Sequence, residues 1–205
     1  MFQPRRRLVA AGAMLVSLSV MIASARAGAP QGANQWTVVA PAGEGFSVLM
    51  PVKPGEETDR VPMMGNTYLM RLYTGVEESN GLLYMVIMQE FPAFTGGLQP
   101  SVRLERFMDG FKQGLTRSLG NTPEAKVELS LERELFLKDR SGRQYTLAVG
   151  ETRGVVRAFD ASKRMYVLLV MGADEKNSNV SRFFNSFEIK AAPDPVPQPP
   201  PPTKP

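Results

Sequence analysis

Short apolar runs separated by turn residues occupy the first half of the chain and predict β-strands. Pro41 and Gly43 separate the first two runs, and Pro51 and Pro54 close the second. The run 82–88 is apolar at nearly every position, so we expect it in the middle of a sheet, covered on both faces. The strands predicted here are 36–40, 46–50, 66–74 and 82–91.

Apolar spacing then changes to three or four residues, which predicts an amphipathic helix. Pro100 and Ser101 begin it, and Gly120 and Asn121 end it. Burying its six apolar side chains should contribute on the order of 10 kcal/mol before the cost of ordering them is subtracted. These side chains are Leu104, Phe107, Met108, Phe111, Leu115 and Leu119.

Four more strands and a second helix are expected in the last third of the domain. The strands are 125–138, 143–150, 154–160 and 164–172, and the breaks between them are short enough to permit only antiparallel hairpins. The helix carries Val180, Phe183, Phe184 and Phe187, and 187–190 could add an edge strand. The order of elements predicts an α+β fold, an antiparallel sheet with two helices packed on it, in a single domain spanning 36–190.

The first 27 residues are typical of a cleavable signal peptide. Three arginines, Arg5 to Arg7, precede an uncharged run that ends in Ala25-Arg26-Ala27, a small-x-small cleavage pattern. We therefore expect a periplasmic or secreted protein that starts near Gly28, with a short linker over 28–35. The arginines also fit a loose twin-arginine pattern, but general secretion is the expected route.

Cleavage changes the charge of the protein. The whole chain has 24 basic and 20 acidic residues, and four arginines leave with the signal, so the mature protein is close to neutral. A neutral protein gives no support to nucleic-acid binding or to attraction by an anionic membrane. The absence of cysteine excludes disulfides, thiol catalysis and a lipidated cysteine, so no membrane anchoring is expected after cleavage. Nothing in the sequence determines the oligomeric state.

The last fifteen residues, 191–205, are dominated by proline. Proline removes backbone donors and fixes φ, so this tail is expected to be disordered and extended in a polyproline manner. It could serve as a docking ligand or a spacer, or it could be a solvated terminus without a partner.

Several short motifs resemble the PsbP-like α/β/α sandwich superfamily. The chain opens with a Trp-led strand and a Phe-Ser-Val-x-x-Pro strand, and closes with Arg182-Phe-Phe-Asn-Ser-Phe-Glu-Ile after a strand meander. The resemblance covers about 36–190 and implies that fold, with a non-enzymatic accessory or binding role. It transfers no functional residues, and metal sites described in some members use histidine, which this chain lacks.

The residues available for chemistry are limited, because the chain has neither histidine nor cysteine. Catalytic triads, cysteine dyads and the usual zinc sites are therefore excluded, and neither a cofactor nor a metal site is expected. Glu128, Glu132 and Glu134 lie at even spacing and would share one strand face, either as the acid/base groups of a hydrolase or as a solvated face. The methionines are better explained as core side chains than as Cu(I) ligands.

One arginine, Arg157, interrupts an otherwise apolar strand. Simple hairpin registers would place it across from Leu147 and near Tyr166, on the face that also carries Tyr145, Val155 and Phe159. The opposite face, where we expect both helices to dock, carries Ala148, Val156, Ala158, Val167 and Leu169.

Arg157, Tyr166 and Tyr145 could then bind a small anionic ligand or an unknown protein. The alternative is a structural arginine paired with Glu132 or Glu134. The sequence thus favours an exported, non-catalytic binding protein, with a carboxylate-dependent hydrolase as the alternative.

Overall fold

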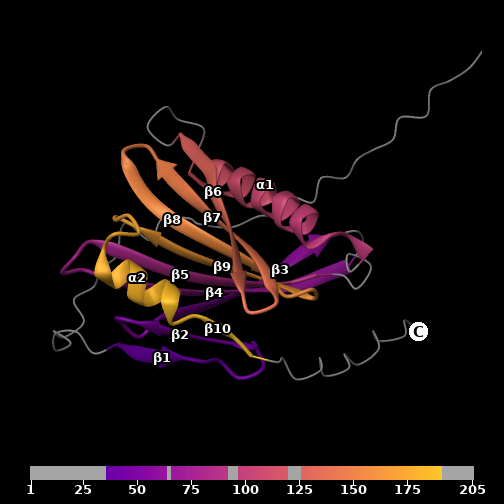
Figure 1. Cartoon of the computed structure of the whole chain (residues 1–205), viewed down its shortest axis with the longest axis horizontal. Helices are drawn as coiled ribbons and strands as arrows, with labels where there is room; N and C mark the ends of the chain where they lie inside the picture. Colours follow the sequence, from indigo (N-terminus) through magenta and orange to yellow (C-terminus); the bar gives the residue numbers. More distant parts are fainter. Residues whose placement is uncertain (1–35, 64–65, 92–96, 120–125, 191–205) are drawn as a thin grey trace, which may run out of the picture.

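The computed structural model describes residues 36–63, 66–91, 97–119 and 126–190, which contain two antiparallel sheets (Figure 1). Neighbouring strands of the larger sheet follow the order β3-β4-β5-β9-β8-β7-β6, and those of the smaller sheet the order β1-β2-β10. In chain order the strands are β1 Thr37–Val39, β2 Phe46–Met50, β3 Gly55–Met63, β4 Asn66–Glu77, β5 Leu82–Glu90, β6 Val127–Leu137, β7 Arg140–Val149, β8 Thr152–Asp160, β9 Arg164–Met171 and β10 Glu188–Ile189.

Helix α1, Pro100–Ser118, covers one face of the large sheet (Figure 1). Proline at its first position needs no intrahelical donor there, which favours this start. Leu104, Phe107 and Phe111 are buried against sheet residues that include Val156 and Val167. The helix and its buried stripe are therefore as predicted.

Helix α2, Ser178–Asn185, covers the opposite face together with the small sheet (Figure 1). The Asn177 side chain caps it by accepting hydrogen bonds from the backbone amides of Asn179 and Val180. Phe183 and Phe184 pack in the same core as β2. The prediction that both helices dock on the Val156 face is wrong, because both faces of the central strands are apolar and each needs its own cover.

The predicted fold class is confirmed as an α+β protein with two helices packed on an antiparallel sheet. Strand β5 lies between β4 and β9, in the interior of the sheet, as its continuous apolar pattern predicts. Strand β3 is not anticipated by the sequence. It is a charged strand, GEETDRVPM, that pairs only with β4 within the described residues, and such composition is typical of a protected sheet edge.

No helix among the described residues is both long enough and apolar enough to cross a membrane. The signal peptide, the linker and the proline-rich tail predicted from the sequence lie outside the described residues.

Candidate ligand-binding groove

Arg157 is not placed as its predicted register requires. It lies opposite Gln144 of β7 and Leu168 of β9, instead of Leu147 and Tyr166. The turn between β7 and β8 is tighter than expected, because Gly150 adopts φ +57° and the strands pair up to Val149 and Thr152.

This tighter turn shifts the β7 pairing by an odd number of residues, which moves Tyr145 to the other face of the sheet. Tyr145 accordingly packs in the α1 core, whereas Tyr166 packs in the α2 core. The Tyr166 hydroxyl donates a hydrogen bond to the Glu44 carbonyl at 2.7 Å. The structure therefore does not bring Arg157, Tyr145 and Tyr166 together.

The Arg157 side chain lies beneath α2, within a polar network. Its guanidinium carbon is 4.6 Å from the Phe184 ring centroid. Nε donates to Gln144 Oε1 at 2.8 Å, and Nη2 donates to Glu175 Oε1 at 2.7 Å. The carboxylate partner is thus Glu175, in the segment before α2, and not Glu132 or Glu134. Burial lowers the pKa of Arg157, which the nearby Glu175 carboxylate opposes.

This network is a structural contact between β7, β8 and the start of α2. Arg133 also donates to Glu175 Oε1, and the Gln144 amide donates to Glu132 and Glu175. Burial acts to raise the pKa of Glu175, but hydrogen bonds from Gln144 and Arg133 outweigh it and hold that pKa below its usual range. Because these side chains are already engaged with one another, the network offers little to a ligand.

The three glutamates of the hydrolase hypothesis do not share a face. Strand β6 has a bulge between Leu131 and Arg133. Such an extra residue reverses the alternation of side chains beyond it.

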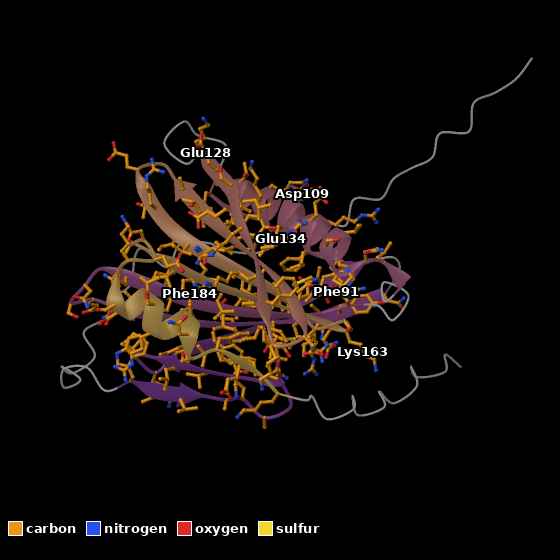
Figure 2. The ribbon with its side chains drawn as sticks, in the orientation of Figure 1. Phe91, Asp109, Glu128, Glu134, Lys163 and Phe184 are labelled. Carbon is orange, nitrogen blue, oxygen red and sulfur yellow. The ribbon has the colours of Figure 1, made fainter. Side chains whose placement is uncertain are left out.

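The partners of the glutamates in β7 show this reversal. Glu128 pairs with Ala148 and Glu134 pairs with Arg143, an odd number of residues apart in β7, so the two glutamates lie on opposite faces of the sheet. Figure 2 labels both side chains. Glu132 accepts hydrogen bonds from Gln144 and from Thr146, on the Ala148 face. The expectation of a three-carboxylate face is therefore wrong.

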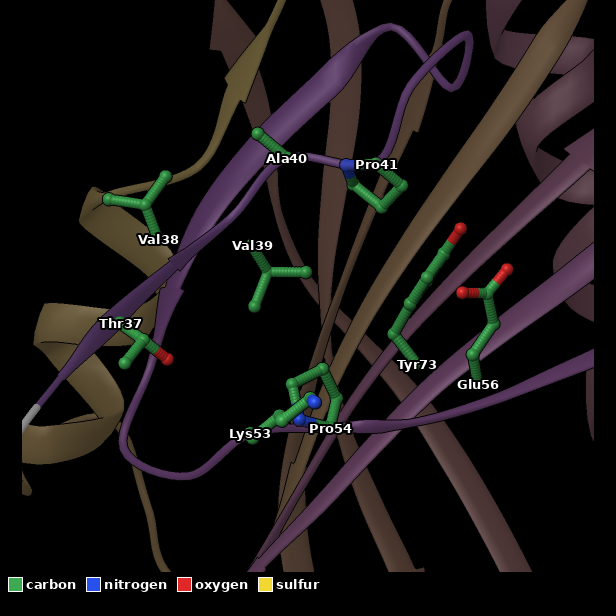
Figure 3. Close-up of a pocket in the computed structure, with 9 residues that line it drawn as sticks. All are labelled: Thr37, Val38, Val39, Ala40, Pro41, Lys53, Pro54, Glu56 and Tyr73. Carbon is green, nitrogen blue, oxygen red and sulfur yellow. The ribbon is translucent and has the colours of Figure 1, made fainter.

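A different concave site lies between the two sheets. It is an open groove of about 450 Å³ (Figure 3). Strand β1 and the residues after it form one wall, the connection from β2 into β3 forms the other, and a β4 side chain contributes to the floor. The lining residues are Thr37, Val38, Val39, Ala40, Pro41, Lys53, Pro54, Glu56 and Tyr73.

Local sequence explains how this groove forms. Pro41 and Gly43 end the β1 run and turn the chain into β2, as the sequence predicts. Gly75 of β4 lets the connection after β2 approach the large sheet, since a Cβ there would lie 2.6 Å from the Val52 side chain. The segment that begins at Lys53 is thereby held opposite β1, on the other side of the groove.

Buried polar atoms without hydrogen-bond partners gather beside the groove. Tyr73 is 2% exposed and Glu44 3% exposed. Within the described part of the chain, Tyr73 Oη, Arg71 Nε and Glu44 Oε2 are buried and have no hydrogen-bond partner. In Figure 3 the Tyr73 side chain extends in the direction of Pro41. A buried unpaired polar group costs free energy, so these atoms mark a place where a ligand group could be bound.

Acidic and basic side chains both surround the buried polar atoms beside the groove. Arg71 Nη1 is 2.5 Å from Glu44 Oε1 and 4.0 Å from Glu56 Oε1. Burial raises the pKa of Glu44, while Arg71 and Arg164 act to lower it. Burial and the Glu44 carboxylate raise the pKa of Tyr73 to about 12, although the neighbouring Arg71 guanidinium acts to lower it, so the hydroxyl stays protonated at neutral pH.

Few titratable side chains line the groove. The titratable lining residues are Lys53, Glu56 and Tyr73, and no pair of them is brought into hydrogen-bond contact. Within the described ranges, no three acidic side chains are grouped in a way that could hold a metal ion. What the groove offers is apolar walls, the Tyr73 side chain, one exposed carboxylate, Glu56, and one exposed amine, Lys53.

No sequence pattern predicts this groove. Lys53, Pro54 and Glu56 belong to a segment for which the sequence predicts no element, and Tyr73 is indistinguishable from a core aromatic residue in an ordinary strand. The groove consists of residues from three separate segments, so no local spacing could reveal it.

Comparison with known proteins adds no assignment. No protein-family model matches the chain, and no curated protein sequence matches it significantly.

Proposed function

We propose that this protein is an exported, non-catalytic binding protein of the cell envelope, and that the groove beside β1 is its ligand-binding site. The observation that carries the proposal is Tyr73, which lines the groove and whose hydroxyl is buried without a hydrogen-bond partner among the described residues. A ligand that accepts a hydrogen bond from this hydroxyl would remove the cost of leaving it unpaired.

Export is supported by the arginine-led apolar segment and by Ala25-Arg26-Ala27. An accessory or binding role is also what the resemblance to the PsbP-like superfamily implies. A hydrolase built on Glu128, Glu132 and Glu134 has less support, because the bulge in β6 separates these side chains between two faces.

Native mass spectrometry of the protein recovered from its own host tests both parts of the proposal. The expected mass is that of a chain beginning near Gly28, plus a bound ligand. Ala40→Trp should abolish the ligand mass, because Ala40 is an exposed lining residue and an indole there would fill the groove. Ser130→Trp, at an exposed position on β6, is the matched control and should keep the ligand.

Two results would contradict the proposal. An unprocessed chain embedded in the membrane would rule out export of a cleaved form. A ligand mass that persists in Ala40→Trp would place the binding site elsewhere.

A further inference from the structure

We propose that the groove binds an extended peptide segment, which adds as a new strand to the outer edge of β1. This inference rests on the proposed function and specifies the chemical class of the ligand. Its main contacts are backbone hydrogen bonds, with side chains selecting the sequence, as in other cases of strand addition.

Among the described residues, the outer edge of β1 is open to such pairing. In the small sheet β1 pairs with β2 only, through Thr37–Met50, Val38–Leu49 and Val39–Val48. Within the part of the chain that the structure describes, no strand pairs with the other side of β1. An edge of this kind presents a row of N–H and C=O groups to an incoming strand.

The groove opens beside this edge, between β1 and the large sheet. Its first wall consists of five consecutive residues, from Thr37 to Pro41. Successive side chains of a strand point to opposite faces, so a cavity on one face would contact only every second residue. All three residues of β1, Thr37 to Val39, line the groove although Val38 points away from it, so the groove also contacts the β1 backbone. Pro41 ends the pairing edge, because proline has no backbone donor.

The facing wall leaves the edge free to pair. Lys53 and Pro54 lie before β3 begins at Gly55, and Pro54 has no N–H to compete for an incoming strand. Gly75 allows this wall to lie close to the large sheet, as described above. The incoming segment would therefore lie between the β1 edge and a wall that makes mainly side-chain contacts.

Side chains around the edge define the preferred peptide. Val38 is 70% exposed, and in Figure 3 it points away from the groove while Val39 points into it. Cross-strand neighbours of valine are favourable when they are β-branched or aromatic, so the peptide should carry such residues at alternate positions. The Glu56 side chain is 52% exposed and would attract a basic residue, whereas Lys53, also exposed, would attract an acidic one. The Tyr73 hydroxyl would donate to a peptide carbonyl.

An oligosaccharide fits these features less well. Stacking on sugar rings requires an aromatic face open to solvent, but the one aromatic lining residue, Tyr73, is 2% exposed. Apolar walls with a free strand edge instead match the backbone and alternating side chains of an extended peptide.

The test uses a pool of capped hexapeptides with valine at positions 1, 3 and 5, screened against the mature protein. The tightest binder is then synthesised as two isomers, N-methylated either at positions 2 and 4 or at positions 3 and 5. Amides of successive residues point to opposite sides of a strand, so positions 2 and 4 share one side and positions 3 and 5 the other, and only one isomer loses the hydrogen bonds to β1. We expect that isomer to bind at least about tenfold more weakly, and the other to bind like the parent.

Each outcome decides between the alternatives. Equal weakening of both isomers would overturn strand addition, as would binding that Ala40→Trp does not reduce. If no peptide in the pool binds, but the protein from its host carries a ligand that Ala40→Trp removes, the peptide class is wrong and the proposed function stands. If neither a peptide nor a ligand from the host is found in the groove, both proposals fail.

Discussion

Replacing Phe107 or Phe184 by aspartate is expected to unfold the domain. Phe107 of α1 is 6% exposed and packs on one face of the sheet, and Phe184 of α2 is 4% exposed and packs on the opposite face. An unpaired carboxylate at either position costs several kcal/mol, against a total stability of about 5–15 kcal/mol for a domain of ordinary size. Circular dichroism of the purified variants should show loss of the cooperative thermal transition.

Exposed positions on the same helices provide matched controls. Gln113→Asp on α1 and Asn185→Asp on α2 introduce a carboxylate at solvent-exposed sites. Both should melt within a few degrees of the wild type, since surface substitutions usually change stability by no more than about 0.5 kcal/mol. A folded Phe184→Asp variant would show that α2 does not stabilise its face of the sheet.

Removing the cation from the buried Arg103–Asp160 ion pair should cause the second largest loss of stability. Arg103 Nε donates to Asp160 Oδ2 at 2.7 Å, and the two side chains are 7% and 2% exposed. Arg103→Met would leave the Asp160 carboxylate buried without this cation, at a cost of about 3–5 kcal/mol. Chemical denaturation should record this as a lower unfolding free energy.

The double variant Arg103→Met/Asp160→Leu separates the cost of the buried charge from the other contributions of Arg103 to stability. Replacing both charges by apolar side chains of similar size removes the uncompensated charge, so we expect most of the lost stability to return. A double variant as unstable as Arg103→Met would show that the loss comes from packing or from the hydrogen bond of Arg103 Nη1 to the Leu98 carbonyl, instead of from the buried carboxylate.

Much of the fold follows from local sequence patterns. The stripe from Leu104 to Leu115 predicts α1, and the continuous apolar run in β5 predicts an interior strand. These predictions succeed because each depends on one segment and its own periodicity. Strand β3 is missed because its polar residues reflect an edge position, which depends on the neighbouring strand and not on the segment itself.

The candidate sites predicted from sequence depend on pairing between segments and are therefore less accurate. A two-residue turn at Gly150 moves Tyr145 away from Arg157, and one bulge in β6 moves Glu134 away from Glu128. Each change involves one or two residues, yet it reverses which face a side chain occupies. The unpaired hydroxyl of Tyr73 could not be predicted from sequence, since it depends on the packing of several segments at once.

The unfolding free energy of ligand-free Tyr73→Phe tests the account most directly. If the Tyr73 hydroxyl is buried and unpaired until a ligand binds, removing it should stabilise the free protein by about 1 kcal/mol. Tyr84→Phe is the matched control, because the Tyr84 hydroxyl donates to Glu77 Oε2 at 2.9 Å. That variant should instead lose about 1 kcal/mol. A loss of stability in Tyr73→Phe equal to that in Tyr84→Phe would show that the Tyr73 hydroxyl is already paired, and would contradict its assignment to a ligand site.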